Sequence, residues 1–531
     1  MKAKKLSELL KESLEKQQNQ PKRLKSSKMI ENNEAERFER RKQDFKNKKN
    51  ISDKLALVEK NLTEKENSTT NIKSYSIDNL KIIGITGSFG KTSTAVLIHR
   101  YLQAIGKKSV LYSSAYIDSP ATWIGRQNSY TSVIKTQDEF LNMVEECLVY
   151  KADYLIVECW EDSIARGVFD NIKFKLKILT SFNDNLMKNI YQNKDTYFNN
   201  KLKFFKDDEN CTVLMNLRSN DNPAFRYQDF IKNISNKKYY FNSQPNMSSK
   251  LKKLHIKTDY SLEYPYYNFL ESSYFTIVSD SYDPQTYLSK LTGWNVDNVL
   301  CSFAALDILR ELDLETFREF IENDDLYITG RNQIIDWKGR KVVIDYDIIN
   351  ALEVCSDAKT DNKDLPADIL AELNARSFKP FEINNIRCMI SPRSEFVSTN
   401  KYKDNYLKNI ARTEIVRADR RFSSDEALSD EDAQQYNELA DQIIINPLNI
   451  GSGNYQDIVN CMKQKITVPV VDYKSRFQAI LNTLMESQKG DVIIVAGRGN
   501  INSNIIEYDK VEFGTDLDLV NKAIAILNNV M

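Results

Sequence analysis

The chain is poor in the residue types that many enzymes use at their active sites. Its 531 residues include only two histidines, His99 and His255, so neither a Ser-His-Asp triad nor a histidine-rich metal site is expected. The seven cysteines contain no Cys-x-x-Cys pair, and their odd number argues against a disulfide framework. A reducing cytoplasm is therefore the compartment that the sequence favours.

Long apolar segments are also missing from the chain. No apolar run approaches the roughly 20 residues that a membrane span needs, so no span is expected. The lysine-rich N-terminus lacks the apolar core of a secretory signal. With 41% hydrophobic and 28% charged residues, the composition is typical of a globular protein. The length exceeds what one core supports, and about two to four domains are expected.

Charge is unevenly distributed along a chain whose net charge is zero. Residues 1–73 hold 20 Lys and Arg against 12 Asp and Glu, a net charge of +8. We expect residues 1–75 to form a charged arm, helical or disordered. Docking to a protein partner or to an anionic surface stays open for this arm. Nucleic acid is an unlikely partner, because no aromatic residues are interleaved with the basic ones.

From residue 76 onward the pattern predicts an α/β fold in two domains, 76–328 and 329–531. Apolar strands alternating with amphipathic helices indicate mostly parallel sheets, with binding sites at the carboxyl ends of the strands. Strands are expected at 82–85, 109–115, 152–162, 176–183, 211–217, 341–347, 385–391, 442–447, 468–473 and 490–500. Helices are expected at 93–106, 136–151, 197–207, 295–309 and 475–487. Residues 235–290 are expected to form an antiparallel excursion.

The stretch 81–94, KIIGITGSFGKTST, combines an apolar strand, a glycine-rich loop and the start of a helix. The motif positions are Gly84, Gly87, Gly90, Lys91 and Thr92. The strict P-loop spacing would place the first glycine at 85, so the match is loose by one residue. In this pattern backbone N–H groups face a phosphate, Lys91 neutralises it, and the Thr92 hydroxyl can reach a magnesium ion.

Seven further motifs follow, and together the eight resemble those of the Mur ligase family, the ATP-dependent amide ligases of cell-wall peptide assembly. The UDP-N-acetylmuramyl tripeptide synthetase branch is the nearest likeness. The motifs are GITGSFGKTST, YLIVECWEDSIARG, LTSFNDNLMKNIYQNKDTYFNNKLKFF, NVDNVLCSFAALDIL, TGRNQII, VVIDYD, IIINPLN and DVIIVAGRGN. Their shared order over about residues 80–525 is more specific than any single motif. The resemblance implies a central P-loop ATP-binding domain followed by a Rossmann-like C-terminal domain.

The resemblance also implies a chemistry and a set of residues. ATP would phosphorylate a carboxylate to an acyl phosphate, and an amino acid or other amine would displace the phosphate. The nucleotide-binding residues implied are Gly87, Ser88, Gly90, Lys91, Thr92, Ser93, Asn298, Arg331 and Asp345. The Mg²⁺-binding residues implied are Thr92, Glu158 and Asp162. Catalysis is assigned to Lys91, Glu158 and Lys201.

Considered alone, several of these residues could also be ordinary residues without a functional role. Lys201 matches the position that is carbamylated in the family, but by itself it would be a solvent-facing helix lysine. Glu158 and Asn298 would be a surface carboxylate and a helix-surface amide. Arg331 and Asp345, which the resemblance places against ATP from the C-terminal domain, would be surface charges.

The departures from the family pattern concern mainly the acceptor substrate. Asp162 stands where the family has a magnesium-binding histidine, and Asn185 and Ile348 replace two further histidines. Leu448 replaces the arginine that grips a diaminopimelate carboxylate, and residues 1–75 do not supply a UDP-binding domain. An amide ligase with a rebuilt acceptor site is the main hypothesis. A ligase-derived nucleotide-binding scaffold without turnover and a plain P-loop NTPase are the alternatives.

Overall fold

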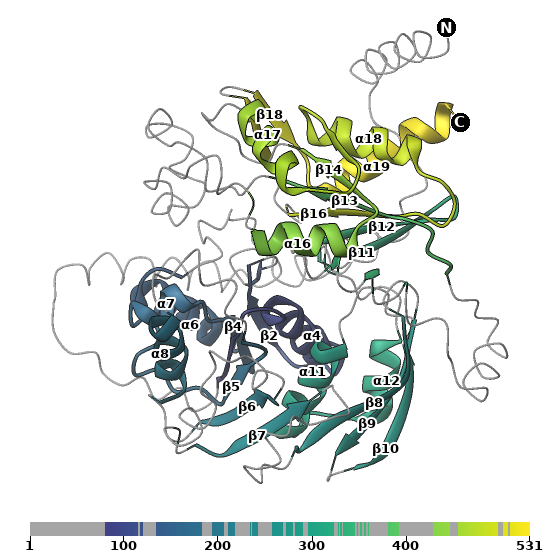
Figure 1. The fold of residues 1–531 in the computed structure, drawn as a ribbon. Helices are drawn as coiled ribbons and strands as arrows, with labels where there is room; N and C mark the ends of the chain where they lie inside the picture. Colours follow the sequence, from purple (N-terminus) through teal and green to yellow (C-terminus); the bar gives the residue numbers. More distant parts are fainter. Residues whose placement is uncertain are drawn as a thin grey trace, which may run out of the picture. The chain divides into compact units, whose positions relative to one another are not determined.

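The computed structural model describes most of residues 80–345 and 381–530, and a few isolated residues between these ranges. The longest gaps are 120–133, 183–193, 218–233, 243–257, 360–380 and 392–427. The arm expected at residues 1–75 lies outside the described residues. The described part contains two large sheets (Figure 1).

The first sheet has ten strands in the order β10-β9-β8-β7-β6-β5-β1-β4-β2-β3. Its strands are β1 (Lys81–Thr86), β2 (Ser109–Tyr112), β3 (Ile117–Asp118), β4 (Tyr154–Glu158), β5 (Leu176–Leu179), β6 (Thr212–Asn216), β7 (Lys238–Asn242), β8 (Tyr260–Asn268), β9 (Ser272–Ser279) and β10 (Tyr282–Ser289). Neighbours from β2 to β8 pair in parallel, with β1 between β5 and β4. The pairs β8–β9 and β9–β10 are antiparallel, which confirms the antiparallel excursion for the later part of 235–290. The expectation is wrong for β7, which pairs in parallel with β6 and β8.

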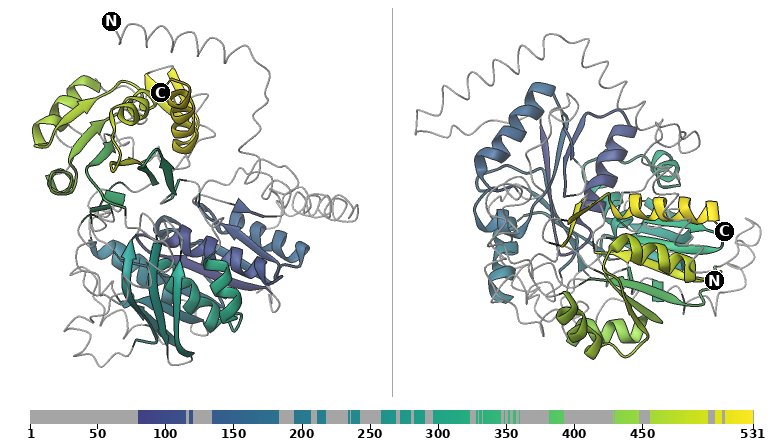
Figure 2. Two further views of the ribbon diagram at one scale, coloured as in Figure 1. Left: turned by 90° about the vertical axis from the view of Figure 1, so that its right-hand side faces the viewer. Right: turned by 90° about the horizontal axis from the view of Figure 1, so that it is seen from above.

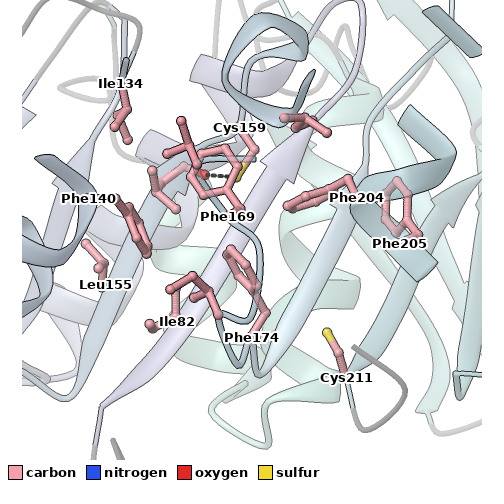
Figure 3. Close-up of a cluster of buried hydrophobic side chains, with 14 of the residues drawn as sticks. Ile82, Ile134, Phe140, Leu155, Cys159, Phe169, Phe174, Phe204, Phe205 and Cys211 are labelled. Carbon is pink, nitrogen blue, oxygen red and sulfur yellow. Dashed lines mark hydrogen bonds between the residues drawn. The ribbon is translucent and has the colours of Figure 1, made fainter. Parts of the chain in front are cut away.

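Helices cover both faces of this sheet, and so its inner strands are apolar on both sides. The helices are α4 (Lys91–Ala104), α6 (Gln137–Tyr150), α7 (Glu161–Ala165), α8 (Lys194–Lys206), α11 (Val296–Ile308) and α12 (Leu314–Ile321). Residues of α4, α11 and α12 form one buried cluster with the sheet, and residues of α6, α7 and α8 form another. In the second cluster Phe169, Phe174 and Phe204 meet edge to face at centroid distances of 5.4–6.1 Å (Figure 3).

The second sheet has six strands in the order β11-β12-β16-β13-β14-β15. Its strands are β11 (Gln333–Trp337), β12 (Arg340–Asp345), β13 (Ile386–Ile390), β14 (Gln442–Ile445), β15 (Val470–Asp472) and β16 (Val492–Ala496). All neighbours are parallel except β11, and β17 (Ser503–Glu507) pairs with β18 (Lys510–Phe513) as a separate hairpin. The helices are α16 (Asp430–Leu439), α17 (Tyr455–Lys465), α18 (Arg476–Glu486) and α19 (Asp516–Val530) (Figure 2).

A fully buried arginine holds together the carboxyl end of this second sheet. Arg476 pairs with Asp516 through two bonds of 2.6 and 2.8 Å. The same guanidinium donates to Asn446 Oδ1 after β14 and to the carbonyl of Ala496 at the end of β16, both at 2.8 Å. Because a buried charge needs a partner at every donor, this network defines where the two strand ends lie.

Two element boundaries differ from the expected ones near the phosphate loop. The helix expected at 93–106 begins two residues earlier, at Lys91, because Gly90 itself serves as its N-cap. The strand expected at 152–162 ends at Glu158, and the short helix α7 follows at Glu161. No helix that the structure describes combines the length and apolar character needed to cross a membrane.

Candidate functional site

The loop between β1 and α4 needs glycine at two positions. Gly90 has φ +80°, and a Cβ there would lie 2.5 Å from Asn298 Oδ1. Gly87 has φ +150°, and a Cβ there would lie 2.0 Å from Thr180 Oγ1. A side chain at either position would force a neighbour to shift, and at Gly87 the backbone N of Ser181 lies within 2.9 Å as well. Together with the positive φ angles, this close approach to α11 and to the residues after β5 favours glycine.

Hydrogen bonds join the middle of the loop to the residues that follow β5. The backbone N–H of Ser88 donates to the carbonyl of Ser181 at 3.0 Å, and that of Phe89 donates to Ser181 Oγ at 2.7 Å. Thr180 Oγ1 donates to the Phe89 carbonyl at 2.5 Å. These contacts fix the loop against the residues that follow β5.

The helix that follows the loop is uncapped in the sense that no side chain caps its N-terminus. Gly90 offers no side chain as a cap, and the first helical hydrogen bond runs from Thr94 N to Gly90 O at 3.0 Å. The N–H groups of Lys91, Thr92 and Ser93 thus have no acceptor within the helix, and its first turn carries no acidic residue. This end of a 14-residue helix suits an anion such as phosphate.

Lys91 is buried and folds back over the loop. Its ammonium group donates to the carbonyl of Gly87 at 2.6 Å and to that of Ser88 at 3.3 Å. The same group lies 4.7 Å from the ring centroid of Trp160. The Lys91 ammonium group, which the motif predicts to bind phosphate, therefore already lies at the loop.

Three other predicted nucleotide-binding residues lie close to the start of α4. Thr92 Oγ1 lies 3.0 Å from Ser114 Oγ, and Arg331 Nη2 donates to the same Ser114 hydroxyl at 3.5 Å. Asn298 on α11 accepts a hydrogen bond of 3.5 Å from Thr94 Oγ1. The structure therefore brings Thr92, Arg331 and Asn298 to the first turn of the helix.

Glu158 ends β4 directly beside the phosphate loop, since its register partner on β1 is Ile85. The residue is 3% exposed, and neither carboxylate oxygen has a hydrogen-bond partner among the described residues. A buried carboxylate without a partner is costly, and a hard divalent cation is the ligand that would compensate it. The alternative of a surface carboxylate is wrong for this residue.

The residues present fit Mg²⁺ bound together with a phosphate ligand. No cluster of three or more His, Cys, Asp or Glu side chains is found in the part of the chain that the structure describes. Mg²⁺ commonly uses one or two protein ligands and takes the rest from phosphates and water. Glu158 and Thr92 match that pattern. Asp162 is half exposed and pairs with Arg166 at 2.9 Å, so its role as a metal ligand stays a prediction.

Lys201 is fully buried, which makes the alternative of a solvent-facing lysine wrong. On α8 it forms an ion pair with Glu161, a residue that the sequence analysis did not select. Its ammonium group lies 4.5 Å from the ring centroid of Tyr197, whose hydroxyl lies 2.8 Å from Ser88 Oγ in the phosphate loop. Helix α8 thus connects Lys201 to the loop. The feature of the sequence that could have pointed to Glu161 is its position three residues after Glu158.

The charges of this group influence one another. Burial lowers the pKa of Lys201 to about 8; the Glu161 carboxylate opposes this shift and the Lys91 ammonium group adds to it. Burial alone would raise the pKa of Glu161, but Lys201 and Lys91 outweigh it and lower the pKa below its usual value. Glu161 is therefore the anion that both lysines share.

Asp345, the remaining predicted residue, ends β12 in the second sheet and is buried. Its backbone carbonyl accepts a hydrogen bond of 3.1 Å from Gly497 N, just after β16. It thus lies at the carboxyl end of two parallel strands, where sites are expected. Its contact with a nucleotide stays a prediction.

Comparison with known proteins shows what the central part of the chain is similar to. Residues 85–306 match the family model of the Mur ligase middle domain. These residues, which carry most of the first sheet, are similar to a Mur ligase middle domain. This agrees with the resemblance inferred from the sequence motifs, and the phosphate loop, Glu158, Lys201 and Asn298 all fall in or at the edge of that match.

Curated relatives of this Mur-ligase-like chain carry one name, UDP-N-acetylmuramoyl-L-alanyl-D-glutamate--2,6-diaminopimelate ligase. The protein of that name from Helicobacter pylori (strain J99 / ATCC 700824) is 25% identical over 460 residues, 85% of each chain. The one from Bacteroides fragilis (strain ATCC 25285) is 24% identical over 439 residues, 82% of this chain and 76% of the relative.

Solved structures agree in fold with the α/β architecture of this chain. A structure of a UDP-N-acetylmuramoyl-L-alanyl-D-glutamate--2,6-diaminopimelate ligase matches with a TM-score of 0.51 and 17% identity, over 85% of this chain and 79% of that one. A crystal structure of MurF from Acinetobacter baumannii also has a TM-score of 0.51, at 12% identity, over 86% and 78% of the two chains. At these identities the likeness concerns the fold alone.

Proposed function

We propose that this chain is an ATP- and Mg²⁺-dependent ligase that activates a carboxylate as an acyl phosphate and joins it to an amino acid or amine. The observation that carries the proposal is the uncapped start of α4, with Lys91 beside it and the orphaned Glu158 carboxylate on the neighbouring strand. The curated relatives are named as ligases, and this agrees with the proposal.

The residues of the loop suit phosphoryl transfer because they bind and orient the phosphates. The N–H groups at the start of α4 would donate to phosphate oxygens, and Lys91 would exchange its loop carbonyls for the β- and γ-phosphates. Positioning and charge neutralisation supply most of the catalysis in this class of reaction. The loop's fixed hydrogen bonds to the end of β5 mean that little reorganisation is needed.

Glu158 and Thr92 are the residues that would hold Mg²⁺. A bound Mg²⁺ would neutralise charge on the transferred phosphoryl group. Glu158 is preorganised for this role, because no protein donor in the described residues competes for its oxygens. Asp162, Arg331 and Asp345 are proposed to complete the site when the substrates are present.

The proposed function also implies a role for each part of the chain. We assign residues 76–328 to nucleotide binding and residues 329–531 to a Rossmann-like domain, after a charged arm at 1–75 whose partner would be a protein or an anionic surface. All seven cysteines are free, which agrees with a reducing cytoplasm.

The test is a purified-protein assay with MgATP and a panel of carboxylates and amino acids. Wild-type protein is expected to release ADP and phosphate only with a matching pair, and mass spectrometry should detect the new amide. Hydroxylamine should trap the acyl phosphate when the amine is omitted. Lys91→Ala should lose these activities, whereas Lys173→Ala, which removes an exposed lysine remote in sequence from the loop, should retain them.

Other outcomes distinguish the competing functions. Nucleotide binding without any amide product from the panel would favour a nucleotide-binding scaffold. Hydrolysis that persists after removal of residues 329–531 would favour a plain P-loop NTPase. Absence of nucleotide binding would contradict all three.

A further inference from the structure

Two polar groups at the carboxyl end of β4 are sealed from solvent without any hydrogen-bond partner among the described residues. They are the carboxylate of Glu158 and the indole N–H of Trp160. Leaving a buried donor or acceptor unpaired is expensive, so each such group in a folded protein needs an explanation. One is an acceptor and the other a donor, yet they do not satisfy each other.

The backbone directs these two side chains to the same side of the sheet. Cys159 N donates to the Ile85 carbonyl at 2.8 Å, which continues the ladder beyond Glu158, and Trp160 is extended with φ −77° and ψ 149°. Residues two apart on an extended chain face the same way. Glu158 and Trp160 therefore face one shared region, beside the phosphate loop.

The immediate neighbour of the Trp160 ring is a cation from the phosphate loop. Lys91 Nζ lies 4.7 Å from the ring centroid, and Lys91 is also the first residue of the uncapped helix α4. A ligand that reached the indole N–H from the side of the phosphate loop would also meet this ammonium group and the backbone N–H groups that have no acceptor within α4. An oxyanion accepts from all three kinds of donor, and phosphate is the oxyanion that a glycine-rich loop before a helix commonly binds.

We propose that the indole N–H of Trp160 donates a hydrogen bond to the β- or γ-phosphate of the bound nucleotide. The face of the same ring positions Lys91, so one side chain contributes a donor and orients a cation. The Glu158 carboxylate, which has no partner among the described residues, would hold the magnesium ion that accompanies the phosphates. The inference rests on the proposed function only in requiring that a nucleotide binds at this loop.

Nuclear magnetic resonance of ¹⁵N-tryptophan-labelled full-length protein tests the hydrogen bond directly. The chain has four tryptophans, and the variant Trp160→Phe identifies the indole signal of Trp160 by its loss. Adding Mg²⁺ with ADP, or with a non-hydrolysable ATP analogue, should move the Trp160 indole proton downfield. An unchanged Trp160 signal at saturation with both nucleotides would overturn the assignment.

Binding affinities provide the second measurement. Trp160→Phe keeps an aromatic face for Lys91 but lacks the N–H, and β-(3-benzothienyl)alanine at position 160 keeps the two-ring shape as well. Both replacements should weaken binding of the ATP analogue roughly tenfold, the effect of one hydrogen bond to a charged group. Trp337→Phe is the matched control, because Trp337 lies on β11 and donates to Asn528 Oδ1 at 3.1 Å.

The outcomes separate this inference from the proposed function. Wild-type affinity in both position-160 variants would overturn the role of Trp160 and leave the nucleotide site intact. Failure of the wild-type protein to bind either nucleotide would overturn the proposed function and this inference together. Thermal unfolding of each variant shows whether a lost affinity reflects a lost fold.

Discussion

The ammonium group of Lys201 and the carboxylate of Glu161 form an ion pair in which the lysine is fully buried. The pair is linked to the phosphate loop through Tyr197, which lies one turn before Lys201 on α8. The Tyr197 hydroxyl contacts Ser88 in that loop. Lys91 also acts electrostatically on both members. The protonation of Lys201 is therefore tied to the loop that would bind phosphate.

The first prediction concerns the reaction of Lys201 with carbon dioxide. Below its pKa of about 8 Lys201 is an ammonium ion paired with Glu161, and an ammonium nitrogen has no free electron pair. Above that pH the neutral amine can attack CO₂, forming the N–C bond of a carbamate and releasing a proton. Carbon-13 NMR in labelled bicarbonate should therefore show a Lys201 carbamate signal that grows as the pH rises through about 8.

The variant Glu161→Gln tests the cause of this behaviour. Glu161 raises the pKa of Lys201, so its neutralisation should lower that pKa and let the carbamate form at lower pH. Lys201→Arg should abolish the signal and serves to assign it. Identical pH dependence in wild type and Glu161→Gln would show that the ion pair does not control Lys201.

The second prediction compares two glycines with similar backbone angles. Gly90 has φ +80° and Gly106 has φ +82°, but a Cβ meets Asn298 at 2.5 Å only in the first case. Gly106→Ala should cost about 1 kcal/mol of unfolding free energy, the strain of a left-handed residue. Gly90→Ala should cost about 3 kcal/mol, because the clash adds to this strain, and should abolish nucleotide binding. Denaturant unfolding and calorimetric titration measure the two effects; equal behaviour of the variants would contradict the crowded loop.

The third prediction is that Glu158→Gln makes the protein more stable and less active. Its carboxylate oxygens have no partner among the described residues, so replacing the charge removes a desolvation cost of about 1 kcal/mol. The same change should lower Mg²⁺-dependent activity about a hundredfold. Thermal unfolding without Mg²⁺ measures the first effect. Asp162→Asn, at the exposed pair with Arg166, should alter stability by less than about 0.5 kcal/mol.

The fourth prediction concerns the buried pair in the second sheet. Arg476→Met should lower the unfolding free energy by about 3–5 kcal/mol, because Asp516 is then buried without its partner. Adding Asp516→Leu should restore most of that loss, since the orphaned charge is removed. Denaturant unfolding of the single and double variants checks both statements. A double variant no more stable than Arg476→Met would show that the network does more than neutralise charge.

The local pattern of the sequence was sufficient for the elements and for the phosphate loop. Strand β1, the glycines and Lys91 are contiguous in the chain, and their order alone predicts a cradle for phosphate. The α/β class and the antiparallel strands β8–β10 followed from apolar periodicity and composition, and the structure confirms them. These features depend on residues close together in sequence, where backbone geometry links residue type to structure.

Only the tertiary structure decided which distant residues meet at the loop. Lys201 comes 110 positions after Lys91, and no spacing rule predicts that a lysine on a charged helix is buried against Glu161. The Trp160 N–H, which has no partner in the described part of the chain, and the closeness of Gly90 to Asn298 likewise arise from packing between separate elements. Burial and ion pairing depend on which residues are neighbours in space. The sequence by itself therefore identified candidate residues, and the fold determined their surroundings.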